Sequence, residues 1–261
     1  MGTRLVNLVV DAARPQELAG FWSALLGWQI AIESPDEVEI HAPADDGWEL
    51  DLIFVPVPAA SASAPPAPPA LPALPAPVPK VTKNRIHLDL ASTSPEHQVA
   101  LVERALGLGA RRRDLGQGDV PWVVLADPEG NEFCVLEPRA VYAGSGAVAA
   151  IVVDSGEPAR LAGFWSALTG WPVCSAEDVI VGLGAPSGRG PRLEFLRSAE
   201  EKVGKNRLHL DVAPSVGEDH AAAVAQVVAA GAVRADVGQG ETPWVVLADP
   251  EGNEFCVLTP R

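Results

Sequence analysis

Two histidine–aspartate pairs are the residues of this sequence best suited to chemistry. They lie in the segments IHLDL and LHLDV, where His87 precedes Asp89 and His209 precedes Asp211 by two positions. Because alternate residues of a strand point to the same side, each histidine shares a face with its aspartate. Such a histidine can bind a divalent metal ion, act as a general base or simply hydrogen-bond its neighbours. The spacing leaves all three roles open.

Other short segments add acidic and sulfur-bearing side chains to the same polar side. In NEFCVL, which occurs twice, strand alternation separates apolar residues from Glu132, Cys134, Glu254 and Cys256. In WELDLIF and PRLEFL it leaves on the polar side Glu49, Asp51, Arg192 and Glu194. A carboxylate on this side is a candidate for proton transfer, and we assign that role to Glu132, Glu254, Asp89 and Asp211. The two cysteines are expected to be small buried side chains that line a binding site.

Tryptophan is the other distinctive feature, with seven residues against one tyrosine. Trp122 and Trp244 follow GQG loops on predicted strands, so their rings could stack on a flat ligand. Trp48 is predicted to be either a ligand contact or an exposed rim residue, and His41 a surface residue of a strand.

The chain is a tandem repeat. LAGFWSALLGW at 18–28 returns as LAGFWSALTGW, KNRIHLDL at 83–90 returns as KNRLHLDV, and PWVVLADPEGNEFCVL at 121–136 returns unchanged. The first copy also contains a Pro-, Ala- and Ser-rich stretch at 56–79, which we interpret as an extended inserted loop because proline disfavours helices and central strands. We predict domains over 1–139 and 147–261, joined by a linker over 140–146.

Each copy contains the same order of predicted elements twice. A strand, a helix that begins near a proline and ends at a glycine, and three short strands are predicted over 5–11, 15–27, 28–33, 37–42 and 48–55. The pattern restarts with a strand over 85–91, a helix over 95–108 and strands near 110–114, 121–126 and 131–137. Four βαβββ modules and an α+β fold follow. The DPEGN motifs are predicted to be tight turns, and the KNR motifs to be surface or inter-module contacts or to grip an anionic substrate.

These segments together resemble the vicinal oxygen chelate superfamily, and within it the glyoxalase/bleomycin-resistance-like proteins. The residues that carry the resemblance are the strand ending in Asp, FWSALLGW, HLDL and DPEGNEF, and they cover nearly the whole chain, apart from 56–79. The resemblance implies two tandem glyoxalase-like domains, each of two βαβββ modules whose sheet curls into a cup. Functions in the superfamily range from glyoxalase, epimerase and ring-cleaving dioxygenase chemistry to metal-free sequestration of antibiotics, so the fold does not determine the function.

The resemblance also implies positions for metal ligands. The positions that match a family ligand and hold a suitable side chain are His87, His209, Asp51 (or Glu49) and Glu194. The late glutamate of the family pattern falls on Cys134 and Cys256, and its early ligand falls near Arg4 and Ala147. Two or three ligands therefore remain in each cup, which leaves a divalent ion (Zn²⁺, Ni²⁺, Mn²⁺ or Fe²⁺) as a hypothesis.

Composition excludes several classes of partner. A net charge of −15 repels nucleic acid and anionic membrane surfaces. No apolar run is long enough to span a membrane, the N-terminus does not resemble a signal peptide, and the three cysteines include no CxxC. We expect a cytoplasmic protein, with a monomer favoured over a dimer because tandem fusion can replace dimerisation.

Three functions remain. The first is a small-molecule binding protein that holds an apolar or aromatic ligand, for resistance or sequestration, through Trp48, Trp122, Trp244, His87, His209, Cys134 and Cys256. The second is a glyoxalase-like metal-dependent lyase, isomerase or dioxygenase that acts on a vicinal-oxygen substrate. The third is a scaffold that uses 56–79 as its contact. Because Glu49 and Asp51 are replaced by Arg192 and Glu194 in the second copy, one functional and one degenerate cup is a further hypothesis.

Overall fold

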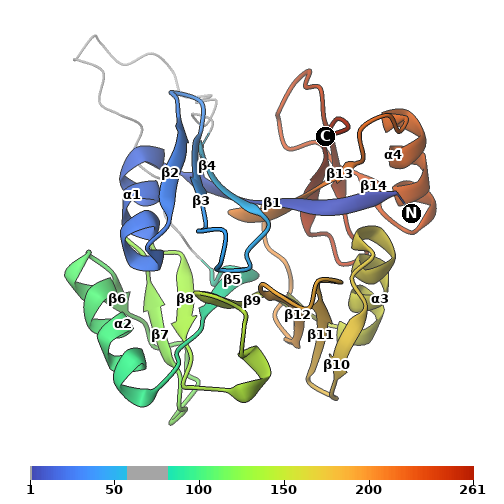
Figure 1. Cartoon of the computed structure of the whole chain (residues 1–261). Coiled ribbons are helices and arrows are strands. Elements are labelled where there is room, and N and C mark those ends of the chain that lie inside the picture. Colours follow the sequence, from blue (N-terminus) through green and yellow to red (C-terminus); the bar gives the residue numbers. More distant parts are fainter. Residues whose placement is uncertain (1, 58–81) are drawn as a thin grey trace, which may run out of the picture.

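The computed structural model describes residues 2–57 and 82–261, and it contains the four expected βαβββ modules (Figure 1). Residues 58–79 of the predicted insertion lie outside the described residues. Among the described helices, none is both long and apolar enough to cross a membrane.

The first sequence copy forms two modules. The first consists of β1 (Thr3–Ala12), α1 (Pro15–Leu26), β2 (Gln29–Glu33), β3 (Val38–His41) and β4 (Asp51–Pro56). The second consists of β5 (Ile86–Leu90), α2 (Pro95–Gly107), β6 (Arg111–Arg112), β7 (Val123–Ala126) and β8 (Glu132–Val135). A short helical turn, η1 (Ala140–Tyr142), follows in the linker.

The second copy repeats this order. Its first module consists of β9 (Val148–Ser155), α3 (Pro158–Thr169), β10 (Val173–Ala176), β11 (Ile180–Gly184) and β12 (Arg192–Arg197). Its second consists of β13 (Leu208–Pro214), α4 (His220–Ala229), β14 (Val233–Arg234), β15 (Val245–Ala248) and β16 (Glu254–Val257). As predicted, α1 and α3 begin with a proline and end at Gly27 and Gly170, both of which have φ of 74°.

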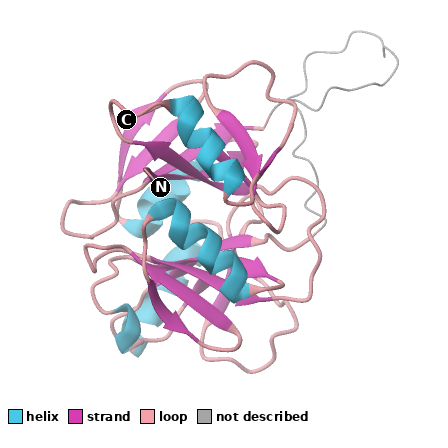
Figure 2. Ribbon diagram, turned by 90° about the vertical axis from the view of Figure 1, so that its right-hand side faces the viewer, coloured by secondary structure: helices cyan, strands magenta, loops and turns pink. Residues whose placement is uncertain are grey.

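Each of the two eight-stranded sheets is built of two modules, and these modules come from different copies. Sheet A has the order β14-β15-β16-β13-β1-β4-β3-β2, and sheet B has the order β10-β11-β12-β9-β5-β8-β7-β6. The first strands of the paired modules run antiparallel at the centre of each sheet, β1 beside β13 and β5 beside β9. Figures 1 and 2 show the two sheets as separate halves of the molecule, with helices against each. The repeat boundaries therefore delimit copies of the sequence, while each sheet is shared between the copies.

Aromatic rings fill the space between the helices and the sheets. Trp22 and Phe133 pack edge to face with ring centroids 5.0 Å apart, and the second copy repeats this contact. Of the two alternatives predicted for Trp48, the exposed rim residue was wrong, because this side chain is only 6% exposed and packs in the core against Trp28, with ring centroids 4.9 Å apart. The ligand contact stays a prediction. An aromatic loop residue beside an apolar partner is buried by the hydrophobic effect, whether or not the repeat contains a counterpart.

The DPEGN turns connect the two sheets. Both carboxylate oxygens of Glu129, in the second module, accept backbone N–H bonds of 2.8 Å from Ala13 and Arg14, at the start of α1 in the first module. Arg207, from the last module, donates to the same carboxylate at 3.3 Å. The expected turn is confirmed, and the KNR arginine makes an inter-module contact.

Candidate functional site

Each sheet has one face covered by helices and one that we call its helix-free face. The core on the helix side includes Leu8, Leu52 and Phe133, whereas separate clusters of buried side chains on the other side include Cys256 in sheet A and Cys134 in sheet B. The strand alternation predicted from the sequence is therefore confirmed for these strands, and the predicted polar residues belong to the helix-free faces.

A row of polar side chains crosses the helix-free face of sheet A. Asn7 on β1 is in register with Asp211 on β13 and with Asp51 on β4, and Asp211 is in register with Cys256 on β16. His41 on β3 extends the row, since its Nε2 lies 3.2 Å from Asp51 Oδ1. Residues from both copies of the sequence thus meet on one surface.

The first part of this row is a buried group of nitrogen, oxygen and sulfur donors. His209, Asp211 and Cys256 present ligand atoms that all lie within 4.8 Å of one another, and Asn7 Nδ2 donates to Asp211 Oδ2 at 3.2 Å. Burial lowers the pKa of His209 to about 3 and raises that of Asp211 to about 7. Burial, and then the negative charge of Asp211, also raise the pKa of the Cys256 thiol. At neutral pH this group consists of a neutral imidazole, a thiol and a carboxyl close to its titration point.

The second part is a more exposed group on β3 and β4. Glu39, His41 and Asp51 also lie within 4.8 Å of one another, and the Glu39 carboxylate contacts His41 Nε2. Burial, and then the negative charge of Glu39, raise the pKa of Asp51. His41 is a surface strand residue as predicted, and it also links two carboxylates of the row.

Sheet B repeats only the first of these groups. His87, Asp89 and Cys134 again lie within 4.8 Å of one another, and His87 Nε2 lies 3.5 Å from Asp89 Oδ1, the same separation as in the second copy. Asp89 is in register with Ala150, which is in register with Arg192. The positions of Asn7 and Asp51 are thus taken by alanine and arginine in sheet B.

The linker lies over the helix-free face of sheet B. The Tyr142 hydroxyl donates to Glu194 Oε2 at 3.0 Å, and the Arg192 guanidinium lies 5.6 Å from the centre of the Tyr142 ring. Arg139, just before the linker, lies 5.6 Å from the centre of the Trp122 ring. Arg139 and the linker of the protein itself therefore lie where a ligand was predicted to contact Trp122.

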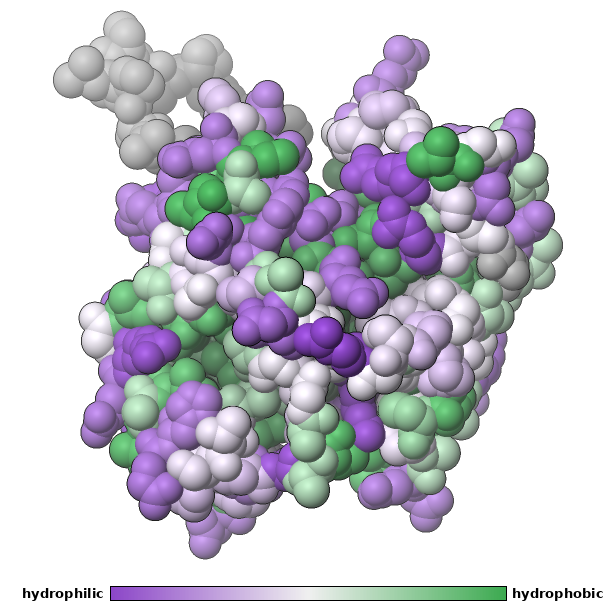
Figure 3. All heavy atoms as spheres, in the orientation of Figure 1, coloured by the Kyte–Doolittle hydropathy of each residue, from purple (hydrophilic) through white to green (hydrophobic). Residues whose placement is uncertain are grey.

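The two faces differ in exposure. The Glu194 side chain is 4% exposed beneath the linker, whereas the side chains of Asp51 and His41 are 41% and 47% exposed. Figure 3 shows the surface hollowed at the top of the view, between the part formed by β2–β4 and the part that contains β14 and the C-terminus. The open face of the molecule is thus that of sheet A.

The remaining predicted residues have other surroundings. Glu254 pairs with Lys202 Nζ at 2.7 Å and accepts from Asn206 N at 3.1 Å, and buried Glu132 accepts from Asn84 N at 3.1 Å. Both glutamates therefore anchor the KNR segments, and their catalytic role stays a prediction. Glu49 is exposed and precedes β4.

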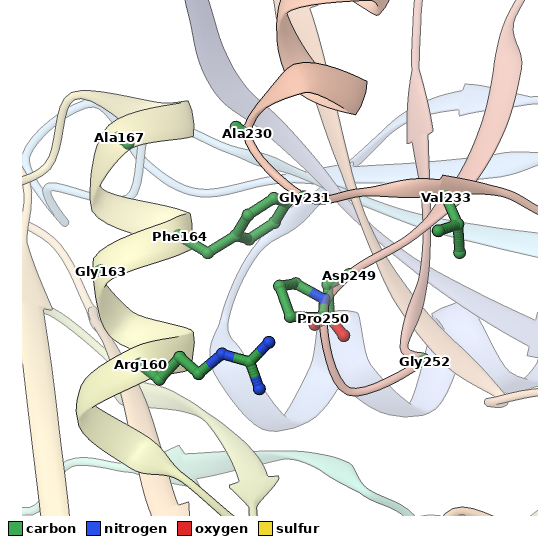
Figure 4. Close-up of a pocket in the computed structure, with 10 residues that line it drawn as sticks. All are labelled: Arg160, Gly163, Phe164, Ala167, Ala230, Gly231, Val233, Asp249, Pro250 and Gly252. Atoms are coloured by element: carbon green, nitrogen blue, oxygen red, sulfur yellow. The ribbon is translucent and has the colours of Figure 1, made fainter.

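A separate pocket of about 560 Å³ lies on the helix side, between α3 and the turn from α4 to β14 (Figure 4). Phe164, Gly231 and Pro250 form apolar walls, and the Arg160 side chain extends toward them. The Asp249 carboxylate in this pocket accepts hydrogen bonds from Trp165 and Asn253, so it holds the DPEGN turn. None of the residues of the polar row of sheet A lines this pocket.

The comparisons with known proteins agree with this architecture. The family description "Glyoxalase-like domain" matches residues 7–136 and 150–258. The chain belongs to this family. The fold of the glyoxalase-like chain is similar to that of glyoxalase I from Zea mays, with a TM-score of 0.62, 13% identity and coverage of 98% of this chain and 92% of that chain. It is also similar to a Bacillus subtilis protein provisionally described as a dioxygenase, with a TM-score of 0.60, 12% identity and coverage of 98% and 84%.

No curated protein matches the glyoxalase-like sequence. The similarities to solved structures establish the fold alone, because their identities are low. The family match, together with this fold, confirms the resemblance to the vicinal oxygen chelate superfamily and the prediction of tandem glyoxalase-like domains.

The donor group of sheet A fits a divalent metal ion of borderline softness. His209 Nδ1, Asp211 Oδ1 and Asn7 Oδ1 are buried without a hydrogen-bond partner in the part of the chain that the structure describes. One neutral imidazole nitrogen, one carboxylate and one thiolate are donors that Zn²⁺ accepts in proteins. On the central strands, Asn7 is in register with Asp211 and Ala150 with Asp89.

Asn7 and Tyr142 are the site residues that sequence analysis missed. Asn7 lies in the apolar run LVNLVV, and its single polar side chain was the signal available. Tyr142 is the only tyrosine of the chain and stands in the linker, but its contact with Glu194 depends on tertiary structure.

Proposed function

We propose that the protein binds a small organic molecule on the helix-free face of sheet A. The observation that carries the proposal is the contrast between the two faces. Tyr142 and Arg139 occupy the face of sheet B, whereas the polar row of sheet A is exposed at Asp51 and His41. Concave, partly apolar faces with a few convergent polar groups are typical ligand sites.

Trp244 supports an aromatic or flat ligand. It directly precedes β15 and lies two residues before Val246, which belongs to the apolar cluster of this face. Continued strand alternation would place its ring on the same side. The side chain is 38% exposed, unlike most tryptophans of the chain. A partly exposed indole beside a polar row can stack on a ring while the row hydrogen-bonds its substituents.

Tryptophan fluorescence tests this proposal. The intact protein is titrated with catechol and 1-naphthol in the presence of EDTA. We expect saturable quenching that is lost in Trp244→Leu and retained in Trp122→Leu, the matched change beneath Arg139. Linear, unsaturable quenching that is the same in both variants contradicts a site at Trp244.

The unpartnered donors favour a second function, a metal-dependent lyase, isomerase or dioxygenase. His209, Asp211 and Cys256 would hold the ion, which when bound polarises adjacent oxygen atoms of a substrate. Asp51 would exchange a proton with the substrate, since its raised pKa brings it closer to neutral pH, and His41 would orient it.

Elemental analysis separates the two functions. The protein is dialysed against Zn²⁺, Ni²⁺, Mn²⁺ or Fe²⁺ and then against metal-free buffer. The enzyme function predicts about one retained ion that is lost in Asp211→Asn and Cys256→Ala, with Cys134→Ala as the matched control in the covered sheet. If the wild type retains no ion under any condition, the metal-dependent function is excluded and the binding function stands.

A further inference from the structure

The linker of sheet B contacts its helix-free face as a ligand would. The guanidinium of Arg139 lies 5.6 Å from the centre of the Trp122 ring, and the Tyr142 ring packs against the apolar cluster that contains Cys134. The protein therefore contains an internal example of what such a face accommodates. A planar cation lies over the tryptophan, where the negative face of the indole attracts it.

Half of this face is chemically identical in the two sheets. The residues of sheet A that repeat those of sheet B are His209, Asp211, Trp244, Val246, Cys256 and Leu258. Val246, Cys256 and Leu258 belong to an apolar cluster of sheet A, as their counterparts do in sheet B, where Trp122 packs against the cluster. Trp244 occupies the same position in the sequence repeat as Trp122 and is more exposed.

The tryptophan of sheet A lacks its cation. Within residues 2–57 and 82–261, no guanidinium or ammonium group is found over the Trp244 ring, whereas Trp122 has Arg139. Arg261, which repeats Arg139, interacts electrostatically with Asp51 and Asp211 instead. The indole is consequently available to a cation from outside the chain.

The other half of the face adds negative charge. Sheet A has Glu39 and Asp51 where sheet B has glycine and Arg192, and Asp211 lies in the same row. Other acidic groups at the ends of these strands are already neutralised, because Asp11 pairs with Lys205 and Glu254 with Lys202. His41, Arg261 and Arg4 are the described groups whose charge lowers the pKa of Asp51, and His41 also contacts Glu39.

We infer that the ligand of sheet A carries a planar cationic group, an amidinium or guanidinium, that stacks on Trp244 and is attracted by Glu39 and Asp51 of the same sheet. This inference rests on the proposed binding function and specifies the class of ligand. The cation gains from the indole quadrupole and from the carboxylates, and the net charge of −15 favours its approach.

Calorimetric titration with benzamidine and benzamide tests the inference. The two compounds have nearly the same shape, but only benzamidine carries a charge at neutral pH. We expect one equivalent of benzamidine to bind about tenfold more tightly than benzamide. Trp244→Leu should weaken benzamidine binding by about tenfold, and Asp51→Asn should weaken it several-fold without affecting benzamide. Trp122→Leu is the matched control, because Arg139 covers the ring of Trp122 in the wild type. This variant should bind benzamidine as the wild type does.

The outcomes separate this inference from the proposed function. Equal affinities for the two compounds, both reduced in Trp244→Leu, overturn the cationic ligand but leave a binding site on sheet A. If neither compound binds while the aromatic titration described above shows a site at Trp244, the cationic class is again overturned. If both experiments show no binding at Trp244, the proposed function falls as well. Circular dichroism of each variant checks folding, and Asp51→Asn provides the comparison if Trp244→Leu is unstable.

Discussion

Replacing Tyr142 with phenylalanine should destabilise the protein by an amount that depends on pH. The hydroxyl donates to Glu194 at 3.0 Å, and this carboxylate is 4% exposed. Its nearest cation is the Arg192 guanidinium, 3.9 Å away. A hydrogen bond to a charged group contributes about 1.5–3 kcal/mol net, and a buried acceptor that loses its donor costs a similar amount. We therefore expect the free energy of unfolding to fall by about 1.5–3 kcal/mol when Glu194 is ionised.

The sign of the pH dependence follows from the buried carboxylate. Burial raises the pKa of Glu194, and the Tyr142 hydrogen bond acts in the opposite direction. Without the hydroxyl this pKa rises further. The loss of stability is then complete above the raised pKa of the variant and shrinks as the pH falls through it, because both proteins hold a neutral carboxyl in acid.

Urea unfolding of the wild type and variant at several pH values between about 4 and 8 measures this difference. Glu194→Gln is the matched background, since its neutral amide removes the charge but keeps the shape. In that background Tyr142→Phe should cost about 0.5–1.5 kcal/mol, with no dependence on pH. A loss that is the same at every pH, or equal in both backgrounds, would refute the argument that a buried charge is being satisfied by the linker.

Three further predictions concern other parts of the fold. Glu129→Ala should lower the free energy of unfolding by about 1–3 kcal/mol in urea, because it removes the bonds that begin α1 from another module, while exposed Glu103→Ala should have little effect. Asp211→Asn should stabilise the metal-free protein at pH 8 by a few kcal/mol. Burial raises the pKa of Asp211 to about 7, so the wild type loses stability as the pH rises toward 7. The asparagine variant should show no such loss. Iodoacetamide should label exposed Cys174 under native conditions. Mass spectrometry should find buried Cys134 and Cys256 unmodified, since burial raises the pKa of their thiols. Equal labelling of all three cysteines contradicts this prediction.

Much of the candidate site could be predicted from strand alternation. The segment IHLDL places Ile86 and Leu88 in the core and leaves His87 and Asp89 on the opposite face, and the structure confirms this division. Alternation is local, so a single strand with one apolar side determines it. The burial of Trp48 could not be predicted in this way, because it lies in a loop, where no periodicity indicates which way a side chain points.

The place of Asn7 in the polar row could not be predicted for a different reason. Alternation defines the faces of β1 but not its register against β13 and β4. The backbone pairing places Asn7 opposite Asp51 and Asp211, and a bulge between Leu5 and Asn7 shifts the register within the strand. A one-dimensional pattern cannot contain this information, because register depends on the partner strand.

The sequence by itself determined the repeat, the four modules, the two faces of each strand and the chemical identity of the half-sites that contain His87 and His209. Tertiary structure alone decided which modules share a sheet. The first strands of all four modules have similar apolar patterns, and nothing local distinguishes β5 from β13 as the neighbour of β1. Contacts far apart in the sequence, such as that of the Glu129 carboxylate with the start of α1, then join the two sheets. Tertiary structure likewise decided that Tyr142 covers one helix-free face and leaves the other open, because a linker is directed by the surface against which it packs and not by its own sequence pattern.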